Sequence, residues 1–395
     1  MKTNLAVFFG CRSVEHEVSI ISAVQAMRAI NREKYDVTPI YVTKSGEMVT
    51  GDVLFDIEQY RNLPALLAKA KPITLVRENG GVFLHEQAGG LFAKKKPVRI
   101  DLAFPVVHGT NCEDGTVAGY LEYLGLPYVG CDILSAAVGM DKAVFKDVLK
   151  SAGLPVLDCV TFRAKEYLLK REETAAKITA AFAFPVIVKP ANLGSSVGIS
   201  KAKDENELHE AITLAASFAD KILVEPAVTA LREINCSVLG DADDCQASVP
   251  EEPFMHDEIL SYGDKYLSGQ KGGSKGMASL SRKIPADLSE EQTREIQDLS
   301  CRIFKAIGAS GVVRIDYLLD TETGKIYANE INTIPGSLAF YLWEASGMKY
   351  PDLIDRLVEL AFKRQRSRDN LTFTIDTNIL SGVSFGAKGA KGSKF

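Results

Sequence analysis

Residues 311–336 read GVVRIDYLLDTETGKIYANEINTIPG, and their alternating pattern is the strongest indication of the fold in this sequence. Apolar and polar side chains alternate from Val312 to Leu319 and again from Lys325 to Asn332. The polar residues Asp320 to Gly324 between them are typical of a turn, so we predict two strands of a β-hairpin. Because successive side chains of a strand point to opposite faces, each strand presents its polar residues on one face.

The polar face of this hairpin has the composition of a metal–phosphate site. Arg314 and Asp316 come from the first strand, and Glu330 and Asn332 come from the second. Mg²⁺ prefers oxygen ligands and shares them with substrate phosphates, so we predict that Asp316, Glu330 and Asn332 bind it. The alternative is a solvated strand face with a salt bridge, which Arg-x-Asp alone would favour. The adjoining run from Asn329 to the Pro-Gly pair favours the metal site.

A second pattern couples a lysine to a glycine-bearing loop. The apolar run Phe184–Lys189 predicts a strand, and Gly194-Ser195-Ser196-Val197-Gly198 follows it. Glycines let backbone N–H groups approach phosphate oxygens, and Lys189 supplies compensating charge. The loop lacks the Gly-Lys-Ser/Thr ending of a Walker A motif and is not a dinucleotide fingerprint. An ordinary tight turn is the alternative, and the preceding lysine favours phosphate binding.

Two polar loops follow predicted strands nearer the start of the chain. The strand Leu5–Phe9 leads into residues 10–19, GCRSVEHEVS, which open a helix where open α/β sheets bind ligands. Helix capping by acidic side chains is the simpler explanation of this loop taken alone. The run Leu102–Val107 leads into residues 108–115, HGTNCEDG, whose spacing is poor for zinc. Scaffolding of the loop explains it as well as direct catalysis does.

The composition of the whole chain excludes several classes of protein. The 395 residues carry a net charge of -5, whereas nucleic-acid binders usually show a basic excess. No apolar run approaches the roughly 18 residues of a membrane helix. Seven scattered cysteines without a C-x-x-C pair indicate reduced thiols rather than a disulfide frame or zinc site. We therefore expect a cytoplasmic protein with neither nucleic-acid nor membrane partners.

The order of predicted elements divides the chain into four parts. Alternating strands and helices predict an open α/β amino-terminal domain at residues 1–135, within which residues 48–98 look irregular. We place a central α+β subdomain at 136–225 and a carboxy-terminal one at 226–365. Residues 260–282 of the latter are polar and glycine-rich, which is typical of a mobile loop over a site. The Lys/Gly-rich end, 366–395, is expected to be a flexible tail.

Taken together and in order, these motifs resemble the D-alanine–D-alanine ligase family of the ATP-grasp superfamily. The similarity extends from about residue 4 to 362 of this sequence. The matching runs are Glu-His-Glu-Val-Ser (15–19), His-Gly…Glu-Asp-Gly (108–115), Met-Asp-Lys (140–142), Lys-Pro…Gly-Ser-Ser-Val-Gly (189–198), Lys-Tyr (265–266), Arg-x-Asp (314–316) and Asn-Glu-x-Asn-Thr-x-Pro-Gly (329–336). The resemblance implies an amino-terminal α/β domain followed by two α+β subdomains that sandwich ATP.

The resemblance also implies a reaction. The carboxylate of a first D-alanine attacks the γ-phosphate of ATP, and the amine of a second D-alanine then displaces phosphate from the acyl phosphate. The implied cofactors are ATP and Mg²⁺, or Mn²⁺ in its place, and a homodimer is expected by analogy with family members. Two alternatives stay open: joining D-alanine to a different D-amino acid or D-hydroxy acid, and a non-catalytic ATP-binding sensor.

Residue roles follow from the matched positions. For ATP, the resemblance implies Lys142, Lys189 and Ser196 at the phosphates, Lys265 at the γ-phosphate, and Glu225 and Glu233 at the adenine and ribose. It implies that Glu15 takes the first substrate's ammonium and is linked through Ser195 to Tyr266. Tyrosine at position 266 favours an amine as the nucleophile over a hydroxyl. Arg314 and the Gly336 N–H would stabilise the oxyanion, and His108 would contact substrate.

Two departures from the family pattern concern the loops around the substrates. Cys112 stands where the family usually has glycine. The segment 337–347, SLAFYLWEASG, is shorter than in the family, where a Ser-Leu pair holds the second substrate's carboxylate. An ungapped register puts Tyr341 and Leu342 at the pair, while Ser337-Leu338 is a nearer but displaced copy. Ser337, Leu338 and Tyr341 are therefore the candidates for binding the second substrate.

Overall fold

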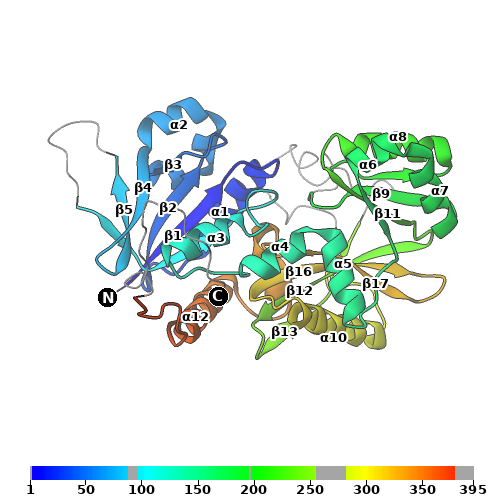
Figure 1. The fold of residues 1–395 in the computed structure, drawn as a ribbon. Coiled ribbons are helices and arrows are strands. Elements are labelled where there is room, and N and C mark those ends of the chain that lie inside the picture. Colours follow the sequence, from blue (N-terminus) through cyan, green and yellow to red (C-terminus); the bar gives the residue numbers. More distant parts are fainter. Residues whose placement is uncertain (1, 88–95, 195–196, 255–281, 379–395) are drawn as a thin grey trace.

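The computed structural model describes residues 2–87, 96–194, 197–254 and 282–378. Three large sheets, each with helices packed on it, follow one another along the described chain (Figure 1). A separate two-stranded sheet pairs residues 252–253 with residues 282–283. This layering of an α/β part before two α+β parts confirms the predicted fold class. No helix within the described ranges is long and apolar enough to cross a membrane.

The amino-terminal part is a seven-stranded mixed sheet with the order β6-β5-β4-β3-β2-β1-β7. Strand β1 lies next to the edge strand β7 and runs parallel to both β2 and β7, and the other neighbouring strands are antiparallel. Its elements are β1 (Thr3–Gly10), α1 (His16–Ala29), β2 (Tyr35–Val42), β3 (Met48–Thr50), η1 (Asp52–Phe55), η2 (Ile57–Arg61), α2 (Leu63–Lys69), β4 (Lys71–Glu78), β5 (Gly81–Glu86), β6 (Val98–Ile100), β7 (Leu102–Pro105) and α3 (Thr116–Leu124).

Residues 48–98 correct one expectation from the sequence. The stretch that looks irregular contains β3, β4 and β5, two 3-10 helices and α2. Short strands such as Met48–Thr50 are too brief to establish a period of two, so the sequence carries little signal for them.

The central part is a four-stranded antiparallel sheet with the order β10-β9-β11-β8. Its elements are α4 (Ile133–Met140), α5 (Lys142–Ser151), β8 (Val160–Arg163), α6 (Ala164–Leu169), α7 (Arg171–Ala181), β9 (Val186–Pro190), β10 (Ser200–Ala202), α8 (Glu205–Ala216) and β11 (Lys221–Pro226). Val188 and Val224 pack against α7 and α8 on one face. Because side chains alternate along a strand, Lys189 and Glu225 project from the opposite face.

The carboxy-terminal part is a second four-stranded antiparallel sheet, with the order β13-β12-β16-β17. Its elements are β12 (Leu231–Gly240), β13 (Cys245–Ala247), β14 (Glu252–Pro253), β15 (Arg282–Lys283), α10 (Glu290–Ala306), β16 (Gly311–Asp320), β17 (Ile326–Asn332), η4 (Gly336–Ala339), α11 (Phe340–Ala345) and α12 (Tyr350–Asp369). Strands β16 and β17 form the predicted hairpin, with Arg314 opposite Asn332 and Asp316 opposite Glu330.

Two helices at the domain boundaries pack across them. Phe145 and Leu149 of α5 share a core with Ile303 of α10 and Ile315 of β16, so α5 covers the carboxy-terminal sheet rather than the central one. Leu357 of α12 is buried in the core of the amino-terminal sheet, beside β1 and α1. Figure 1 shows α12 below that sheet, between the amino-terminal and carboxy-terminal parts. Helix α12 continues to Asp369, so the expected tail begins in a helix.

Candidate active site

The polar face of the carboxy-terminal sheet carries a row of acidic and amide side chains. Glu251 bridges to Asn235 of β12, Asn235 lies opposite Asp316 of β16, and Asp316 lies opposite Glu330 of β17. Directly paired residues of neighbouring strands place their side chains on the same face. The other face is apolar and buried against α5 and α10. The alternation of apolar and polar residues therefore gives this sheet one face that packs in the core and one that carries the candidate site residues.

The three predicted metal ligands lie together on this face, held by cations. Asp316 accepts two hydrogen bonds from the Arg314 guanidinium, both of 2.7 Å, and one of 3.1 Å from the Asn332 amide. Lys142 lies 3.1 Å from Glu330. Burial alone would lower the pKa of Arg314, but Asp316 outweighs it and holds this pKa above its usual value. Two carboxylates and an amide in one cationic patch are a donor set that fits Mg²⁺ shared with phosphates.

Facing this sheet, the central subdomain presents two lysines around a buried carboxylate. Glu225 lies 2.5 Å from Lys189 through one oxygen and 2.5 Å from Lys146 through the other. Burial opposes ionisation of Glu225, yet the two lysines outweigh it and hold the pKa of its carboxyl below the usual value. Burial lowers the pKa of Lys146, against the opposing effect of Glu225. Glu225 therefore fixes the lysine that the sequence assigns to phosphate binding.

A β-bulge in β17 lies where the carboxy-terminal sheet contacts the central sheet. The register of β16 and β17 shifts between Asp316 and Tyr317, which leaves Asn329 as the extra residue of β17. The Lys189 ammonium donates a 3.0 Å hydrogen bond to the side-chain oxygen of Asn329. Bulges re-aim a side chain and are frequent beside active sites. Here the bulge places Asn329, the chain neighbour of the predicted metal ligand Glu330, against the lysine that is predicted to bind phosphate.

Glu15 reaches the same region from the amino-terminal domain. It occupies the N-cap position of α1, but its side chain makes no capping hydrogen bond, so capping does not explain it. A methyl group added at Gly109 or Gly194 would come within 2.6 or 2.8 Å of its carboxylate, so both loops close around Glu15. Burial and the charge of Glu15 raise the pKa of the neighbouring Glu113 to about 8. A carboxylate in this position suits a substrate ammonium.

His108 orders the loop that follows β17. Its Nδ1 lies 2.9 Å from the Ile334 carbonyl, so it donates there and Nε2 accepts from Ser22 at 3.0 Å. Ser22 in turn accepts the Ser337 N–H at 3.0 Å. Burial lowers the pKa of His108 to about 4, which keeps the ring neutral as this network requires. His108 thus scaffolds the segment around Gly336, with both ring nitrogens engaged by protein.

With the geometry of the site described, comparison with known proteins gives it a family. A model described as D-ala D-ala ligase C-terminus matches residues 148–359, and one described as D-ala D-ala ligase N-terminus matches residues 4–131. The chain belongs to the D-alanine–D-alanine ligase family. The resemblance read from the sequence motifs is thereby confirmed.

Individual relatives cover almost the whole chain. A D-alanine–D-alanine ligase of Acetivibrio thermocellus is 41% identical over 383 residues, which span 94% of this chain and 98% of the relative. The solved D-alanine–D-alanine ligase from Coxiella burnetii has a TM-score of 0.75 and 31% identity, covering 93% of this chain and 96% of that one. The VanG D-Ala:D-Ser ligase from Enterococcus faecalis has a TM-score of 0.76 and 30% identity, covering 91% and 100%. The predicted ATP-grasp fold is confirmed by these likenesses.

The segment beyond the family's Pro-Gly pair has its own geometry in this chain. Ser337, Leu338 and Ala339 are buried and all have positive φ, forming a left-handed turn. The Ser337 hydroxyl donates to Gln25 of α1 at 2.6 Å, and Leu338 packs in the amino-terminal core. Tyr341 of α11 instead donates a 3.0 Å hydrogen bond to Glu251. Burial and the charge of Glu251 raise the pKa of its hydroxyl to about 12, against the opposing charge of Arg314. Of the three candidates for the second substrate, Ser337 and Leu338 are therefore held by the amino-terminal part, whereas Tyr341 is held by Glu251.

Four residues at the site were missed by sequence reasoning. Lys146 follows Lys142 by one helical turn on α5, a spacing that could have indicated a shared face. The role of Asn329 depends on the β-bulge, which the sequence does not predict. Glu251 and Arg282 come close to the site only through the tertiary fold. Of the predicted residues, Ser195, Ser196, Lys265 and Tyr266 lie outside the described residues. Glu233 lies on the polar face of β12, two residues from Asn235.

Cys112, the departure from the family glycine, is a packing residue. It is buried with Cys11 and Val107 in a small apolar cluster. Its contact with Cys11 and its burial raise the pKa of the thiol, so the group stays neutral. All seven cysteines fall within the described ranges, and all are free thiols there.

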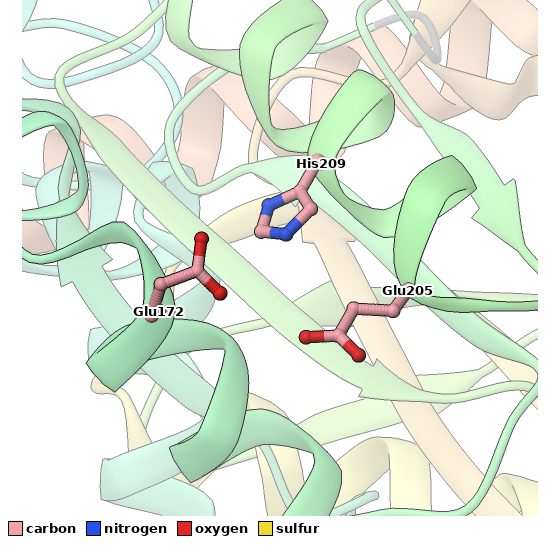
Figure 2. A group of neighbouring side chains, drawn as sticks. All are labelled: Glu172, Glu205 and His209. Atoms are coloured by element: carbon pink, nitrogen blue, oxygen red, sulfur yellow. The ribbon is translucent and has the colours of Figure 1, made fainter.

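A separate group of potential metal ligands lies away from this site. Glu172 on α7 and Glu205 and His209 on α8 point toward one another on the helical layer of the central subdomain (Figure 2). That layer covers the face of the sheet opposite Lys189 and Glu225. His209 Nδ1 accepts a 3.1 Å hydrogen bond from Arg171, which places the ring proton on Nε2. A donor N–H beside a guanidinium suits pairing with carboxylates better than binding a cation.

Proposed function

We propose that this chain catalyses the ATP-dependent joining of two D-alanine molecules to D-alanyl-D-alanine, for peptidoglycan precursor synthesis. The observation that carries the proposal is the meeting of three groups from three parts of the fold. Glu15 comes from the amino-terminal domain, Lys142 and Lys189 from the central part, and the acidic row from the hairpin. This combination suits a reaction in which an amino-acid carboxylate attacks a nucleotide phosphate.

In the first step the carboxylate of one D-alanine attacks the γ-phosphate of ATP, giving D-alanyl phosphate and ADP. Glu15 would hold the substrate ammonium, and Lys142 and Lys189 would hold nucleotide phosphates. Asp316, Glu330 and Asn332 would hold Mg²⁺, or Mn²⁺ in its place, which neutralises phosphate charge when bound. Positioning and charge compensation of this kind account for most catalysis of phosphoryl transfer.

In the second step the amine of another D-alanine attacks the acyl carbon, and phosphate leaves. Negative charge develops on the acyl oxygen in the transition state. Arg314 and the backbone N–H of Gly336 would stabilise it, and a single donor of this kind is typically worth about 10²–10³ in rate. The pairing of Arg314 with Asp316 keeps the guanidinium fixed before charge develops.

A second candidate is the joining of D-alanine to another acceptor. The short 337–347 segment lies where family members hold the second substrate, and one similar structure is a D-Ala:D-Ser ligase. Product masses from a panel of D-amino acids and D-hydroxy acids decide between the two. D-alanine as the best acceptor throughout would exclude this candidate.

Phosphate release in the presence of ATP, Mg²⁺ and D-alanine tests the ligase reaction itself. We expect D-alanine-dependent release from the wild type and a fall of at least about 10²-fold in Asp316→Asn. Asp320→Asn, at the end of the same strand and outside the site, is the matched control. ATP binding without any amino-acid-dependent release would instead indicate a nucleotide sensor.

We also propose a homodimer and a cytoplasmic location. The large apolar side chains Tyr123 and Leu134, on the neighbouring helices α3 and α4, are 89% and 68% exposed, which suits a protein interface. Seven free thiols suit a reducing compartment. Sedimentation at several concentrations would test the dimer.

A further inference from the structure

A buried cation on α5 has no role in the two-step reaction described above. Lys146 is 0% exposed, and its ammonium lies 2.5 Å from one oxygen of Glu225 and donates a 3.1 Å hydrogen bond to the Leu157 carbonyl. It follows Lys142 by one helical turn, so the two lysines lie on the same side of α5. Apolar side chains of similar size often replace a buried ion pair without loss of stability. The charge of Lys146 therefore calls for an explanation other than packing.

The carboxylate that Lys146 contacts is shared with the lysine predicted to bind phosphate. The other Glu225 oxygen lies 2.5 Å from the Lys189 ammonium, which also donates a 3.0 Å hydrogen bond to Asn329. Because Glu225 and Lys189 are 1% and 4% exposed, salt and water screen their attraction only weakly. Glu225 therefore opposes phosphate binding in two ways: it competes for the Lys189 ammonium, and it repels the charge of the phosphate.

Lys146 compensates for both effects. A carboxylate between two lysines neutralises only one of their two charges, so the group of Lys146, Glu225 and Lys189 keeps one positive charge. Without Lys146 the remaining pair is neutral, and a phosphate meets the charge of Glu225 uncompensated. At an effective dielectric constant of about 20, removing one unit charge about 8 Å from an anion weakens its binding by roughly 30-fold.

We propose that Lys146 is a positioning residue for the nucleotide phosphates: it takes up the charge of Glu225 and so leaves the Lys189 ammonium available to phosphate. The inference rests on the proposed ligase function and deepens it, because it names what keeps the phosphate subsite cationic. Two simpler explanations compete with it. In the first, Lys146 serves only the packing of α5. In the second, it orients Glu225 toward the adenine, the role that the family resemblance implies for Glu225.

ADP and adenosine separate these explanations, because only ADP carries phosphates. The dissociation constants of the full chain for ADP with Mg²⁺ and for adenosine are measured by calorimetry, and their ratio reports the contribution of the phosphates. We expect Lys146→Met to reduce the preference for ADP by roughly 10- to 100-fold, with little change in the affinity for adenosine. A packing role predicts the wild-type preference, and a role at the adenine predicts equal losses for both ligands, so either result overturns the proposal.

Further variants test whether the charge itself is responsible. Lys146→Gln keeps a donor for the Leu157 carbonyl but no charge, so it should show the same loss even if Lys146→Met does not fold. Combining Lys146→Met with Glu225→Gln removes both charges and leaves that of Lys189, so the preference for ADP should return to near that of the wild type. Lys150→Met is the matched control, one turn further along α5. The Lys150 side chain is 38% exposed and pairs with Asp158 at 2.8 Å, so this variant should keep the wild-type preference.

The outcomes of this experiment distinguish the inference from the ligase function. A wild-type preference in Lys146→Gln, an equal loss in Lys150→Met, or no recovery in the double variant overturns the inference. ADP binding is measured without D-alanine, so it does not depend on turnover. Absence of D-alanine-dependent phosphate release from the wild type would refute the ligase function, whereas normal synthesis with an unchanged preference for ADP in the Lys146 variants would refute the inference alone.

Discussion

At the scale of single residues, Glu225 shows how burial and charge are balanced in this site. It is 1% exposed and lies between Lys146 and Lys189. Glu225→Gln leaves two buried cations facing each other, and we expect it to reduce the free energy of unfolding by about 3–5 kcal/mol. Lys146→Met should cost less, because Glu225 keeps Lys189 as a partner. Urea denaturation of each variant measures both effects.

The matched control for this pair is an exposed one. Lys170 and Glu173 form an ion pair on the surface, where 57% and 71% of their side chains are exposed. Glu173→Gln should change stability by less than about 0.5 kcal/mol. A loss as small as this in Glu225→Gln would mean that water reaches the buried pair.

Also at the scale of single residues, His108 should make the stability of the protein depend on pH. Its pKa is lowered from 6.5 to about 4 by burial, so the unfolded chain binds a proton at a pH where the folded chain does not. The stability from neutral His108 is therefore present above the unfolded pKa and is lost as pH falls toward the folded one. From about pH 7.5 to about pH 5 this loss is about 2 kcal/mol. His108→Gln has no such titration, so its stability gap to the wild type should narrow by that amount in urea titrations at the two pH values.

At the scale of elements, the hairpin is where sequence and structure agree best. Alternation over Val312–Leu319 and Lys325–Asn332 predicted strands that the structure places at Gly311–Asp320 and Ile326–Asn332. The face carrying Arg314, Asp316, Glu330 and Asn332 follows from the same alternation. The bulge at Asn329 does not, because an extra residue in one strand depends on how the partner strand and Lys189 are placed.

The left-handed turn could not have been predicted for a different reason. Positive φ is usually marked by glycine, yet Ser337, Leu338 and Ala339 have φ of 52°, 56° and 50°. Contacts with Ser22 and Gln25 and the burial of Leu338 hold the turn in place. These contacts join residues more than 300 positions apart in the chain. The sequence of the segment itself therefore does not indicate these contacts.

The strain in this turn is open to measurement at Ala339. A left-handed conformation costs an L-residue about 1–2 kcal/mol, whereas glycine adopts it freely and loses about 0.5–1 kcal/mol through unfolded-chain entropy. We therefore expect Ala339→Gly to be neutral or stabilising by up to about 1 kcal/mol. Ala175→Gly, at a buried helical position in α7, should instead destabilise by about 1 kcal/mol. Equal losses in both variants would contradict the argument.

At the scale of the whole molecule, the hydrophobic cores contain helices from more than one part of the chain. Helix α12 closes the amino-terminal core, and α5 closes the carboxy-terminal one. The boundaries predicted at residues 135 and 225 therefore separate helices from the sheets against which they pack. This sharing brings Glu15, Lys142, Lys189 and Glu330 to one place although they are spread over most of the chain. The site exists only where all three parts meet.

A nucleotide bound between the central and carboxy-terminal parts should stabilise the molecule as a whole. A non-hydrolysable ATP analogue with Mg²⁺, at about 100 times its dissociation constant, should add about 2.7 kcal/mol and raise the melting temperature by several degrees. Chelating the metal with EDTA should remove much of this gain, because phosphate charge would then face Asp316 and Glu330 uncompensated. Glu330→Gln should lose the metal-dependent part of the shift, whereas Glu322→Gln, in the exposed turn of the same hairpin, should retain it. Melting curves with and without EDTA measure this difference, and an unaltered metal effect in Glu330→Gln would place the metal elsewhere.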